Sequence, residues 1–466
     1  MERVHQIASH FASGQTAQQA MAPKDVLIVG SGVFGLGTAY ALAQREDFKK
    51  TKITVLERTQ FPAQDASSVD SSRIIRADYE DVLYAQLMEE AMPHWKGEFG
   101  EEGRFSQSGL AIMSNGRNES AETFLEAALK NVTEKLGLQI GKDITVFDNE
   151  ADARKIMGTT GGLIGTRGYV NWTSGWAHAE NGLKFLRKKV EALNRVHFQT
   201  AEVQRLLFDS SYTSVLGVQL ADNTTLTADL TILATGAWTP KLLDTRGICS
   251  ATGQVLTFVD ITDEEQARLT QKGQPVILRE NDGLFIIPPV ENKLKIARHG
   301  YGYANFVTIP HPEKPASSGE KITVSIPKTK LDDPDMDIPA EGKKVCRDFL
   351  RDAVPSLADR PFSSTRICWY TDTPSGDWLI TYHPKYKGLF VATGGSGHGY
   401  KFLPTIGERI VDVIQGKERD ELGRQLAERW KWSEKREKED HVWTSDWRGE
   451  GVKGMVLEDE MRKGVV

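Results

Sequence analysis

Residues 25–58 of the chain read DVLIVGSGVFGLGTAYALAQREDFKKTKITVLER. Residues 26–29 have the apolar, β-branched character of a buried strand and lead directly into the glycine pattern of residues 30–35. A second apolar run at 53–56 ends at Glu57, 22 residues after the last of these glycines. Strand, glycine turn, helix, strand and acid, in that order, form the fingerprint of a dinucleotide-binding βαβ unit. The stretch therefore predicts a Rossmann-type domain.

The three glycines of the turn stand where a bound dinucleotide needs them. Gly30 permits the tight turn, Gly32 lets a pyrophosphate approach the backbone, and Gly35 lets the helix lie close to the sheet. The helix start at Val33 and Phe34 would present unpaired N–H groups and a positive dipole end to the phosphates. Glycine turns are common, so the prediction depends equally on the flanking strands and the spaced acid.

Glu57 stands at the end of the second strand, where an acid accepts hydrogen bonds from an adenosine ribose. An acid here favours FAD or NAD over NADP, whose 2′-phosphate is usually met by an arginine. Arg58 follows directly, so NADP stays as the weaker alternative.

Length and charge limit the classes of protein. A chain of 466 residues is too long for one ordinary core, so we expect two domains or more. The net charge of −6 implies no basic face, and we expect no nucleic-acid partner. No apolar run approaches the roughly 18 residues that cross a bilayer, and no signal-peptide core is visible. The final residues, KGVV, are not a peroxisomal tripeptide. We therefore expect no membrane association and a cytoplasmic location.

The three cysteines, Cys249, Cys346 and Cys368, form no CxxC pair and cannot build a disulfide framework. This usage favours a reducing compartment. The ten histidines show no HExxH or other metal-ligand spacing, so we expect no metal site.

A second glycine-rich junction stands far along the chain. Residues 389–393 form an apolar strand that runs into GGSGHGYK at 394–401, and a helix is expected at 405–414. This junction could bring another helix N-terminus to the same cofactor. The pattern at 197–207 predicts one strand, and 246–367 reads as β-rich.

Six motifs together resemble the amine-oxidising flavoprotein family of monomeric sarcosine oxidase, pipecolate oxidase, saccharopine oxidase and fructosyl amino acid oxidase. The resemblance spans residues 24–416. The motifs are GSGVFGLG at 30–37, SSRIIR at 71–76, GAWTPKLL at 236–243, LKIARH at 294–299, CWYTDTP at 368–374 and GGSGHGYK at 394–401.

The resemblance implies an α/β fold in which a Rossmann-type, glutathione-reductase-like FAD-binding domain is interleaved with a mixed β-sheet substrate domain. It also implies a monomer that acts on a small amine and O2. On this basis we expect a disordered lead-in at 1–23, the FAD-binding domain at 24–80, 171–245 and 368–416, the substrate domain at 81–170 and 246–367, and a C-terminal tail at 417–466. Four tryptophans suggest that the tail docks on the body: Trp430, Trp432, Trp443 and Trp447.

Two residues would act directly on the flavin if the resemblance holds. Cys368 matches the family's cysteine that bonds through sulfur to the flavin 8α-methyl carbon; the alternative is an inert buried thiol. Lys295 matches a lysine whose charge helps the reduced flavin pass electrons to oxygen; the alternative is a solvated strand lysine. In a strand, His299 shares a face with Lys295.

Arg76 and Lys401 match the family's pair of cations that hold the substrate carboxylate. Arg73 matches a residue that lies against the flavin ring. The alternative for either arginine is a structural ion pair with a nearby acid, namely Asp70, Asp78 or Glu80.

The predicted site is thus a definite set of residues. Lys295, His299 and Arg73 are the expected catalytic residues, and His398 faces either flavin or substrate. The expected cofactor-binding residues are Gly30, Gly32, Val33, Phe34, Gly35, Glu57, Arg58, Ser72, Arg73, Cys368, Gly395, Gly397, His398, Gly399 and Lys401.

The implied reaction is oxidation of a secondary amine beside a carboxylate to an imine, with O2 reduced to hydrogen peroxide. N-methyl or cyclic amino acids such as sarcosine, pipecolate or saccharopine are the expected substrates. Two alternatives stay open: a fructosyl amino acid, or an N-methylated aromatic amino acid in secondary metabolism.

Overall fold

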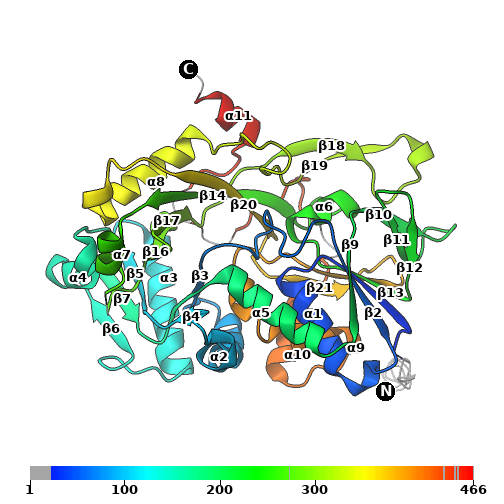
Figure 1. Ribbon diagram of the computed structural model, residues 1–466, viewed down its shortest axis with the longest axis horizontal. Coiled ribbons are helices and arrows are strands. Elements are labelled where there is room, and N and C mark those ends of the chain that lie inside the picture. The colour runs from blue at the N-terminus through cyan, green and yellow to red at the C-terminus, as the bar shows by residue number, and fades with distance from the viewer. Residues whose placement is uncertain (1–21, 272, 434–435, 446–447, 449–450, 465–466) are drawn as a thin grey trace, which may run out of the picture.

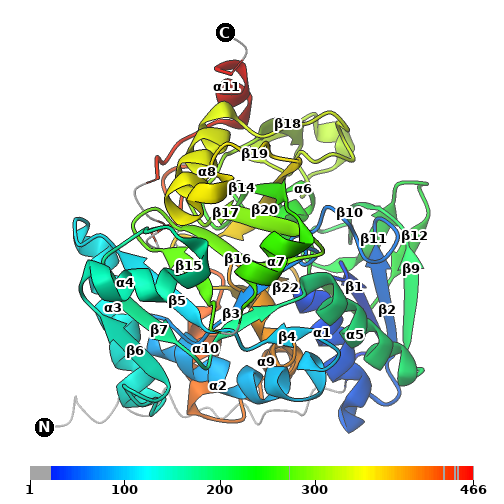
Figure 2. The same ribbon diagram turned by 60° about the vertical axis from the view of Figure 1, so that its left-hand side comes forward.

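The computed structural model describes residues 22–271, 273–433, 436–445, 448 and 451–464 (Figure 1). The predicted lead-in therefore lies almost wholly outside the described residues, and so does Trp447. Two large sheets organise the molecule and lie side by side in Figure 2.

The first sheet has six strands in the order β21-β22-β13-β1-β2-β9. Its strands run parallel except β21, which is an antiparallel edge. Residues 25–57 supply two neighbouring strands of this sheet, β1 and β2, and the helix α1 that connects them along the chain (Figure 2). The bounds are β1 (Asp25–Val29), α1 (Val33–Gln44), β2 (Lys52–Glu57), β9 (Val196–Thr200), β13 (Leu230–Leu233), β21 (Leu379–Tyr382) and β22 (Leu389–Thr393).

Both faces of this sheet are buried, as the continuous apolar runs of a parallel sheet require. Successive side chains of a strand point to opposite faces. Val26 and Ile28 therefore pack with α1, whereas Leu27 and Val29 pack with a small three-stranded sheet, β10-β11-β12. The covering elements are α5 (Ala179–Ala192), α9 (Ile406–Gln415), β10 (Val203–Phe208), β11 (Val215–Leu220) and β12 (Thr225–Thr227).

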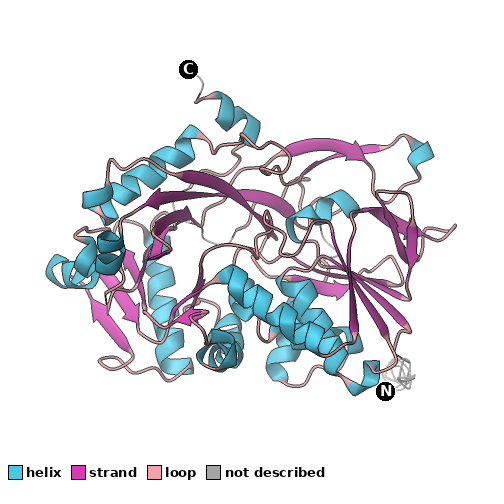
Figure 3. Ribbon diagram, in the orientation of Figure 1, coloured by secondary structure: helices cyan, strands magenta, loops and turns pink. Residues whose placement is uncertain are grey.

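The second sheet has eight strands in the order β20-β14-β17-β16-β15-β5-β7-β6, and it is mixed because β15 and β5 run parallel. Helix α8 covers one face and α3 the other (Figure 3). The bounds are β5 (Leu110–Ser114), β6 (Ile144–Phe147), β7 (Arg167–Asn171), β14 (Ser250–Asp260), β15 (Val276–Arg279), β16 (Leu284–Val290), β17 (Lys293–Arg298), β20 (Ser364–Asp372), α3 (Glu119–Lys130), α4 (Glu150–Met157), α7 (Asp263–Leu269) and α8 (Ala340–Ala353).

The remaining elements connect the two sheets or lie at their edges. They are β3 (Arg73–Ile75), β4 (Phe105–Ser106), β8 (Gly175–Ala177), β18 (Phe306–Pro310), β19 (Lys321–Ser325), α2 (Val82–Lys96), α6 (Thr239–Leu242), α10 (Glu421–Arg429) and α11 (Leu457–Arg462). Among the described residues, no helix is both long and apolar enough to span a bilayer.

Three details of the sequence prediction need correction. The strand expected at 197–207 is two strands, β9 and β10, which belong to different sheets. The expected domain boundary at residue 368 falls inside β20, a strand of the eight-stranded sheet that runs on to Asp372. Residues 368–372 therefore pair with β14 and not with the nucleotide-binding sheet.

The third correction concerns the second glycine-rich junction. The helix after it, α9, begins only at Ile406, and a short 3-10 turn separates it from the glycines. A Cβ on Gly407 would lie 1.9 Å from the carbonyl oxygen of Gly37, so α9 is pressed against α1. Close packing of α9 on α1 therefore explains Gly407, which lies beyond the glycines of the junction.

The described part of the tail lies against the body of the molecule. Helix α10 contacts α2, and α11 contacts α8. The ring of Trp430 is buried and stacks on Trp378 with 5.2 Å between ring centroids. The backbone N–H of Val442 donates to the hydroxyl of Ser250.

Candidate active site

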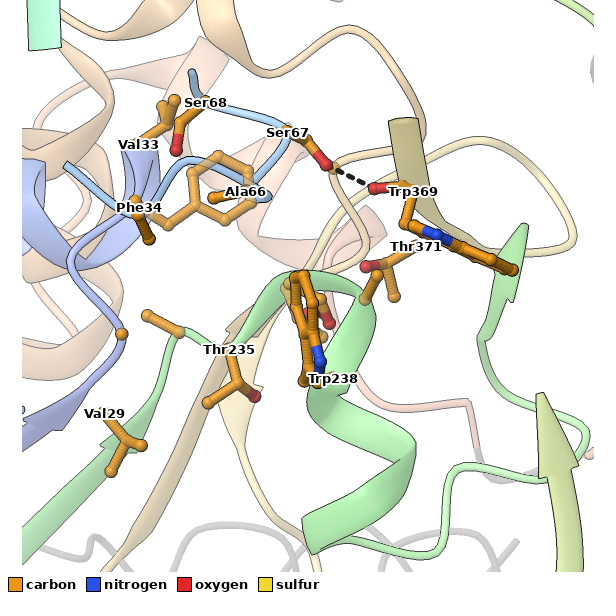
Figure 4. A pocket seen from close by; sticks show the side chains of 18 of the residues that line it. Val29, Val33, Phe34, Ala66, Ser67, Ser68, Thr235, Trp238, Trp369 and Thr371 are labelled. Atoms are coloured by element: carbon orange, nitrogen blue, oxygen red, sulfur yellow. Dashed lines mark hydrogen bonds between the residues drawn. The ribbon is translucent and has the colours of Figure 1, made fainter. Parts of the chain in front are cut away.

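A first cavity lies at the carboxyl ends of β1 and β2 (Figure 4). It contains Gly30, Gly32, Val33, Phe34, Glu57, Arg58, Arg73, Gly395, Gly397 and Gly399 of the predicted set. Ligands of open α/β sheets bind at this edge, outside the carboxyl ends of the strands. In Figure 4 the side chains of Val33 and Phe34 come from the start of α1, and Trp238 and Trp369 stand on the opposite side of the opening.

Close backbone contacts leave no room for a side chain at two glycines of the turn, Gly30 and Gly35. Gly30 has φ +101°, and a Cβ there would lie 2.4 Å from the carbonyl oxygen of Ala234. A Cβ on Gly35 would lie 1.9 Å from the carbonyl oxygen of Gly30. Gly35 therefore packs behind the cavity and does not line it, whereas the backbone of Gly32 is open to it.

Glu57 lies at the wall of this cavity and is held by the turn itself. One carboxylate oxygen accepts hydrogen bonds from the backbone N–H and the hydroxyl of Ser31, at 2.9 and 2.8 Å. The guanidinium of Arg58 lies 4.3 Å from the ring centroid of Trp238 and forms an ion pair with Asp65. The guanidinium of Arg58 therefore already has two partners, the carboxylate of Asp65 and the ring of Trp238.

A second cavity adjoins the first. The two share lining residues from β3, β20 and the second glycine-rich segment: Arg73, Tyr370, Ser396, Gly397 and Tyr400. The second cavity brings together Arg73, Arg76, Lys295, His299, Cys368, His398 and Lys401 of the predicted set. These residues are up to 328 positions apart, counting from Arg73 to Lys401, and only the fold unites them.

A buried charge cluster stands at the junction of the two cavities. The ammonium of Lys295 lies 2.6 Å from the carboxylate of Asp70 and donates to the carbonyl of Ser72 at 2.9 Å. Arg73 pairs with the same carboxylate and donates to the sulfur of Cys368 at 3.5 Å. Burial, opposed by Asp70 and assisted by Arg73, lowers the pKa of Lys295 to about 8.

The alternative of an ion pair with a nearby acid is found for Arg73, whose guanidinium pairs with Asp70. Asp78, by contrast, accepts from the side chains of Asn171 and Ser174. Ser72 contributes only its backbone carbonyl to Lys295 and lines neither cavity.

Arg76 and Lys401 face the second cavity from opposite ends of the sequence. The Nη1 of Arg76 is buried and has no hydrogen-bond partner among the described residues. The Nζ of Lys401 donates to the hydroxyl of Tyr79 at 2.9 Å and to the carbonyl of His398 at 3.0 Å, both uncharged acceptors. Burial and the nearby charge of Arg76 lower the pKa of Lys401 well below its usual value. Among the described residues, neither the Nη1 of Arg76 nor the Nζ of Lys401 is therefore bonded to a carboxylate.

The hydrogen bonds around Tyr79 fix a neutral histidine. His398 contacts the carbonyl of Gly376 through Nε2 at 3.0 Å, so Nε2 carries the proton and Nδ1 accepts from the hydroxyl of Tyr79 at 3.1 Å. Burial and the charge of Lys401 lower the pKa of His398 well below its usual value. Burial and the charge of Arg448 do the same for His299, whose Nδ1 lies 3.4 Å from the hydroxyl of Tyr370.

Three residues of this site were absent from the prediction as site residues: Asp70, Tyr79 and Arg448. Asp70 and Tyr79 flank the SSRIIR motif, so their closeness to a motif was the only available signal. Arg448 reaches the second cavity from the C-terminal tail, where it bonds Asp372 and the carbonyl of Ser396. No pattern in the sequence marks it.

A cavity at the carboxyl ends of a Rossmann-type sheet fits a dinucleotide cofactor, and the adjoining second cavity fits a small substrate. The chain belongs to the FAD dependent oxidoreductase family, which it matches over residues 25–413. It is 32% identical to amino acid oxidase imqH of Aspergillus flavus, over 88% of this chain and 98% of that protein. It is 29% identical to L-saccharopine oxidase of Schizosaccharomyces pombe, over 88% and 93%. The structure of fructosamine oxidase (Amadoriase II) from Aspergillus fumigatus aligns with a TM-score of 0.76 and 28% identity, covering 94% and 96%.

These similarities confirm the predicted family, the α/β fold class and the enzyme class, an FAD-dependent oxidase of amine or amino-acid donors. The residues of the first cavity also fit FAD. Glycine backbone lines the wall where a side chain would fill space, the start of α1 faces the opening, and Glu57 lines the wall at the end of β2, where an acid would accept hydrogen bonds from a ribose.

Proposed function

We propose that the enzyme oxidises a secondary amine that carries a carboxylate, such as an N-methyl or cyclic amino acid. The observation that supports this most strongly is the pair Arg76 and Lys401. Arg76 has a buried N–H group without a hydrogen-bond partner in the described part of the chain, and the pKa of Lys401 is lowered by burial and by the charge of Arg76. A carboxylate between them would satisfy both, because it accepts charge-assisted hydrogen bonds and neutralises the repulsion.

The second cavity would also favour the neutral form of the amine. The charges that act on His299 and His398 are those of Arg76, Lys401 and Arg448, so an ammonium group beside these two histidines is disfavoured. A neutral amine has the free electron pair that oxidation to an imine requires. The chemistry that FAD supplies when bound is acceptance of a hydride equivalent from the carbon beside the nitrogen and return of the electrons to O2 as hydrogen peroxide.

Lys295 is the proposed cation for the oxygen reaction. It is buried, it lines the second cavity close to the junction, and a fixed positive charge stabilises the negative charge that develops as O2 is reduced. Arg73 is proposed to lie against the bound cofactor, since it lines both cavities.

We further propose that Cys368 holds FAD covalently through its sulfur. Cys368 is buried, lines the second cavity and receives a hydrogen bond at its sulfur from Arg73, a residue that lines both cavities. Acid denaturation of the purified protein tests this directly. We expect yellow colour and flavin fluorescence to stay with the polypeptide and to be released from Cys368→Ala. Release from both proteins would refute the bond.

A second candidate substrate has a specific observation behind it. Aromatic rings line the second cavity, from α2, the segment before it, α3, β16 and β20: Tyr79, Tyr84, Phe124, Phe285 and Tyr370. Such a wall suits an N-methylated aromatic amino acid, whose ring would stack edge-on or offset against these rings.

A peroxide assay with a panel of amines tests both candidates and the remaining alternative. The panel contains sarcosine, pipecolate, saccharopine, N-methyltyrosine and fructosyl-valine. Turnover of any of the first three supports the main proposal, and preference for N-methyltyrosine supports the aromatic candidate. Turnover of fructosyl-valine alone would overturn both.

A further inference from the structure

We infer that Asp70 is a positioning residue, which acts through Lys295 by holding its side chain at the junction of the two cavities and keeping it positively charged. The inference rests on the proposed role of Lys295 in the oxygen reaction. It concerns a residue that lies behind the wall of both cavities and so contacts neither of the proposed ligands.

The geometry places the carboxylate between two buried cations. Its Oδ2 lies 2.6 Å from Nζ of Lys295 and also pairs with Arg73. Its Oδ1 accepts from the backbone N–H of Ser71 at 2.7 Å. The side chains of Asp70 and Lys295 are only 2% and 4% exposed, so solvent screens this pair very little.

The cluster contains more positive than negative charge. The groups that act on Lys295 are Asp70, Arg73 and Cys368, and of these Arg73 repels it. Arg366, which donates to the carbonyls of Val69 and Ala66, adds its charge to the field around Asp70. An arginine does not give up its proton in a protein, whereas a lysine does. Of the three cations named here, Lys295, Arg73 and Arg366, only Lys295 is therefore able to lose its charge near physiological pH when the carboxylate is removed.

The pKa values of Asp70 and Lys295 agree with a carboxylate that stays ionised and a lysine that can lose its proton. Burial opposes ionisation of Asp70, but Arg73, Lys295 and Arg366 together hold its pKa well below its usual range. For Lys295, burial and Arg73 lower the pKa and Asp70 raises it, with the result of about 8. A lysine with this pKa is mostly charged at neutral pH and loses its charge as the pH rises past about 8.

Asp70→Asn tests the inference, because asparagine keeps the shape and one acceptor but removes the charge. The first readout is independent of turnover: competitive labelling of lysines with trace acetic anhydride at a series of pH values, with the Lys295 peptide quantified by mass spectrometry. We expect the apparent pKa of Lys295 to fall by roughly 1 to 3 units. An unchanged pKa would overturn the inference.

The second readout is stopped-flow kinetics of the two half-reactions. A fall of about 1.5 units would leave roughly one eighth of the charged lysine at about pH 7.5, so reoxidation by O2 is expected to slow about eight-fold there. Reduction by amine should change far less. In Asp70→Asn combined with Lys295→Arg, the permanent charge of arginine is expected to restore reoxidation relative to Asp70→Asn. Equal slowing of both half-reactions would contradict the inference.

Two further variants separate this inference from the proposed function. Lys295→Met is expected to slow reoxidation, whereas Lys293→Met, on the same strand but exposed and paired with Asp260, is the matched control. If Lys295→Met leaves reoxidation unchanged, the proposed role of Lys295 fails, while the labelling result still decides the effect of Asp70. If Asp70→Asn does not fold, Asp70→Glu replaces it. Glutamate keeps the charge, so a Lys295 pKa that falls by one unit or more in Asp70→Glu would overturn the inference.

Discussion

Replacement of Arg76 by methionine is the most informative change in the proposed carboxylate site. Methionine keeps much of the length and apolar bulk of arginine but removes its charge and its donors. A hydrogen bond to a charged group contributes about 1.5–3 kcal/mol, and each 1.4 kcal/mol is about ten-fold in affinity. The amine dissociation constant is therefore expected to rise about 10- to 150-fold. The maximum rate of reduction should change less, because the carboxylate is held in both ground and transition states.

The structure also predicts that this variant folds well. Within the part of the chain that the structure describes, Arg76 has a buried N–H group without a hydrogen-bond partner, and its charge lowers the pKa of Lys401. Its guanidinium lies 5.1 and 5.6 Å from the ring centroids of Tyr79 and Phe124, and methionine can fill that space against both rings. We therefore expect little loss of thermal stability in Arg76→Met.

The assay is stopped-flow reduction of the enzyme by a good substrate and by the same amine with its carboxylate converted to an amide. Wild type should bind the amide poorly, and Arg76→Met should bind both compounds with similarly low affinity. Arg429→Met is the control, because Arg429 lines the same cavity but is already paired with Asp81. An equal loss of affinity for acid and amide in Arg76→Met would refute the reasoning.

Two predictions concern the framework around the site. Gly407→Ala places a Cβ 1.9 Å from the carbonyl oxygen of Gly37, so the α1–α9 contact must open at a cost of about 1–3 kcal/mol; an unchanged melting temperature would count against the packing described here. Arg448→Met removes the partner of the buried carboxylate of Asp372 and is expected to cost about 3–5 kcal/mol in urea unfolding. Adding Asp372→Asn should recover much of that loss, and no recovery would show that Arg448 stabilises the fold by other means.

Local sequence was sufficient for the nucleotide-binding half. Residues 26–29 and 53–56 fall within β1 and β2, and residues 389–393 coincide with β22. Apolar runs of only four or five residues, rich in β-branched side chains and bounded by glycine or acid, favour buried strands over helices, so tertiary context had little to add. The split of 197–207 into β9 and β10 was missed because both halves have strand character, and only the pairing partners differ.

The predicted site residues were drawn from separate motifs, and their common location could not be read from spacing. Arg73, Arg76, Lys295, Cys368 and Lys401 meet at one cavity because β3, β17, β20 and the segment after β22 converge there. Their chemical roles stay predictions that the experiments above test.

The sequence by itself determined the class of the molecule: a glycine turn, an acid at a fixed spacing and a set of motifs act locally, through backbone conformation and strand pattern. Only the tertiary structure decided which charges are neutralised. Asp70 pairs with Lys295 across 225 residues and Asp372 with Arg448 across 76, while Arg76 keeps a buried donor unpaired. Electrostatic interactions depend on distance and burial in the folded chain, and neither quantity is encoded in the spacing of residues along it.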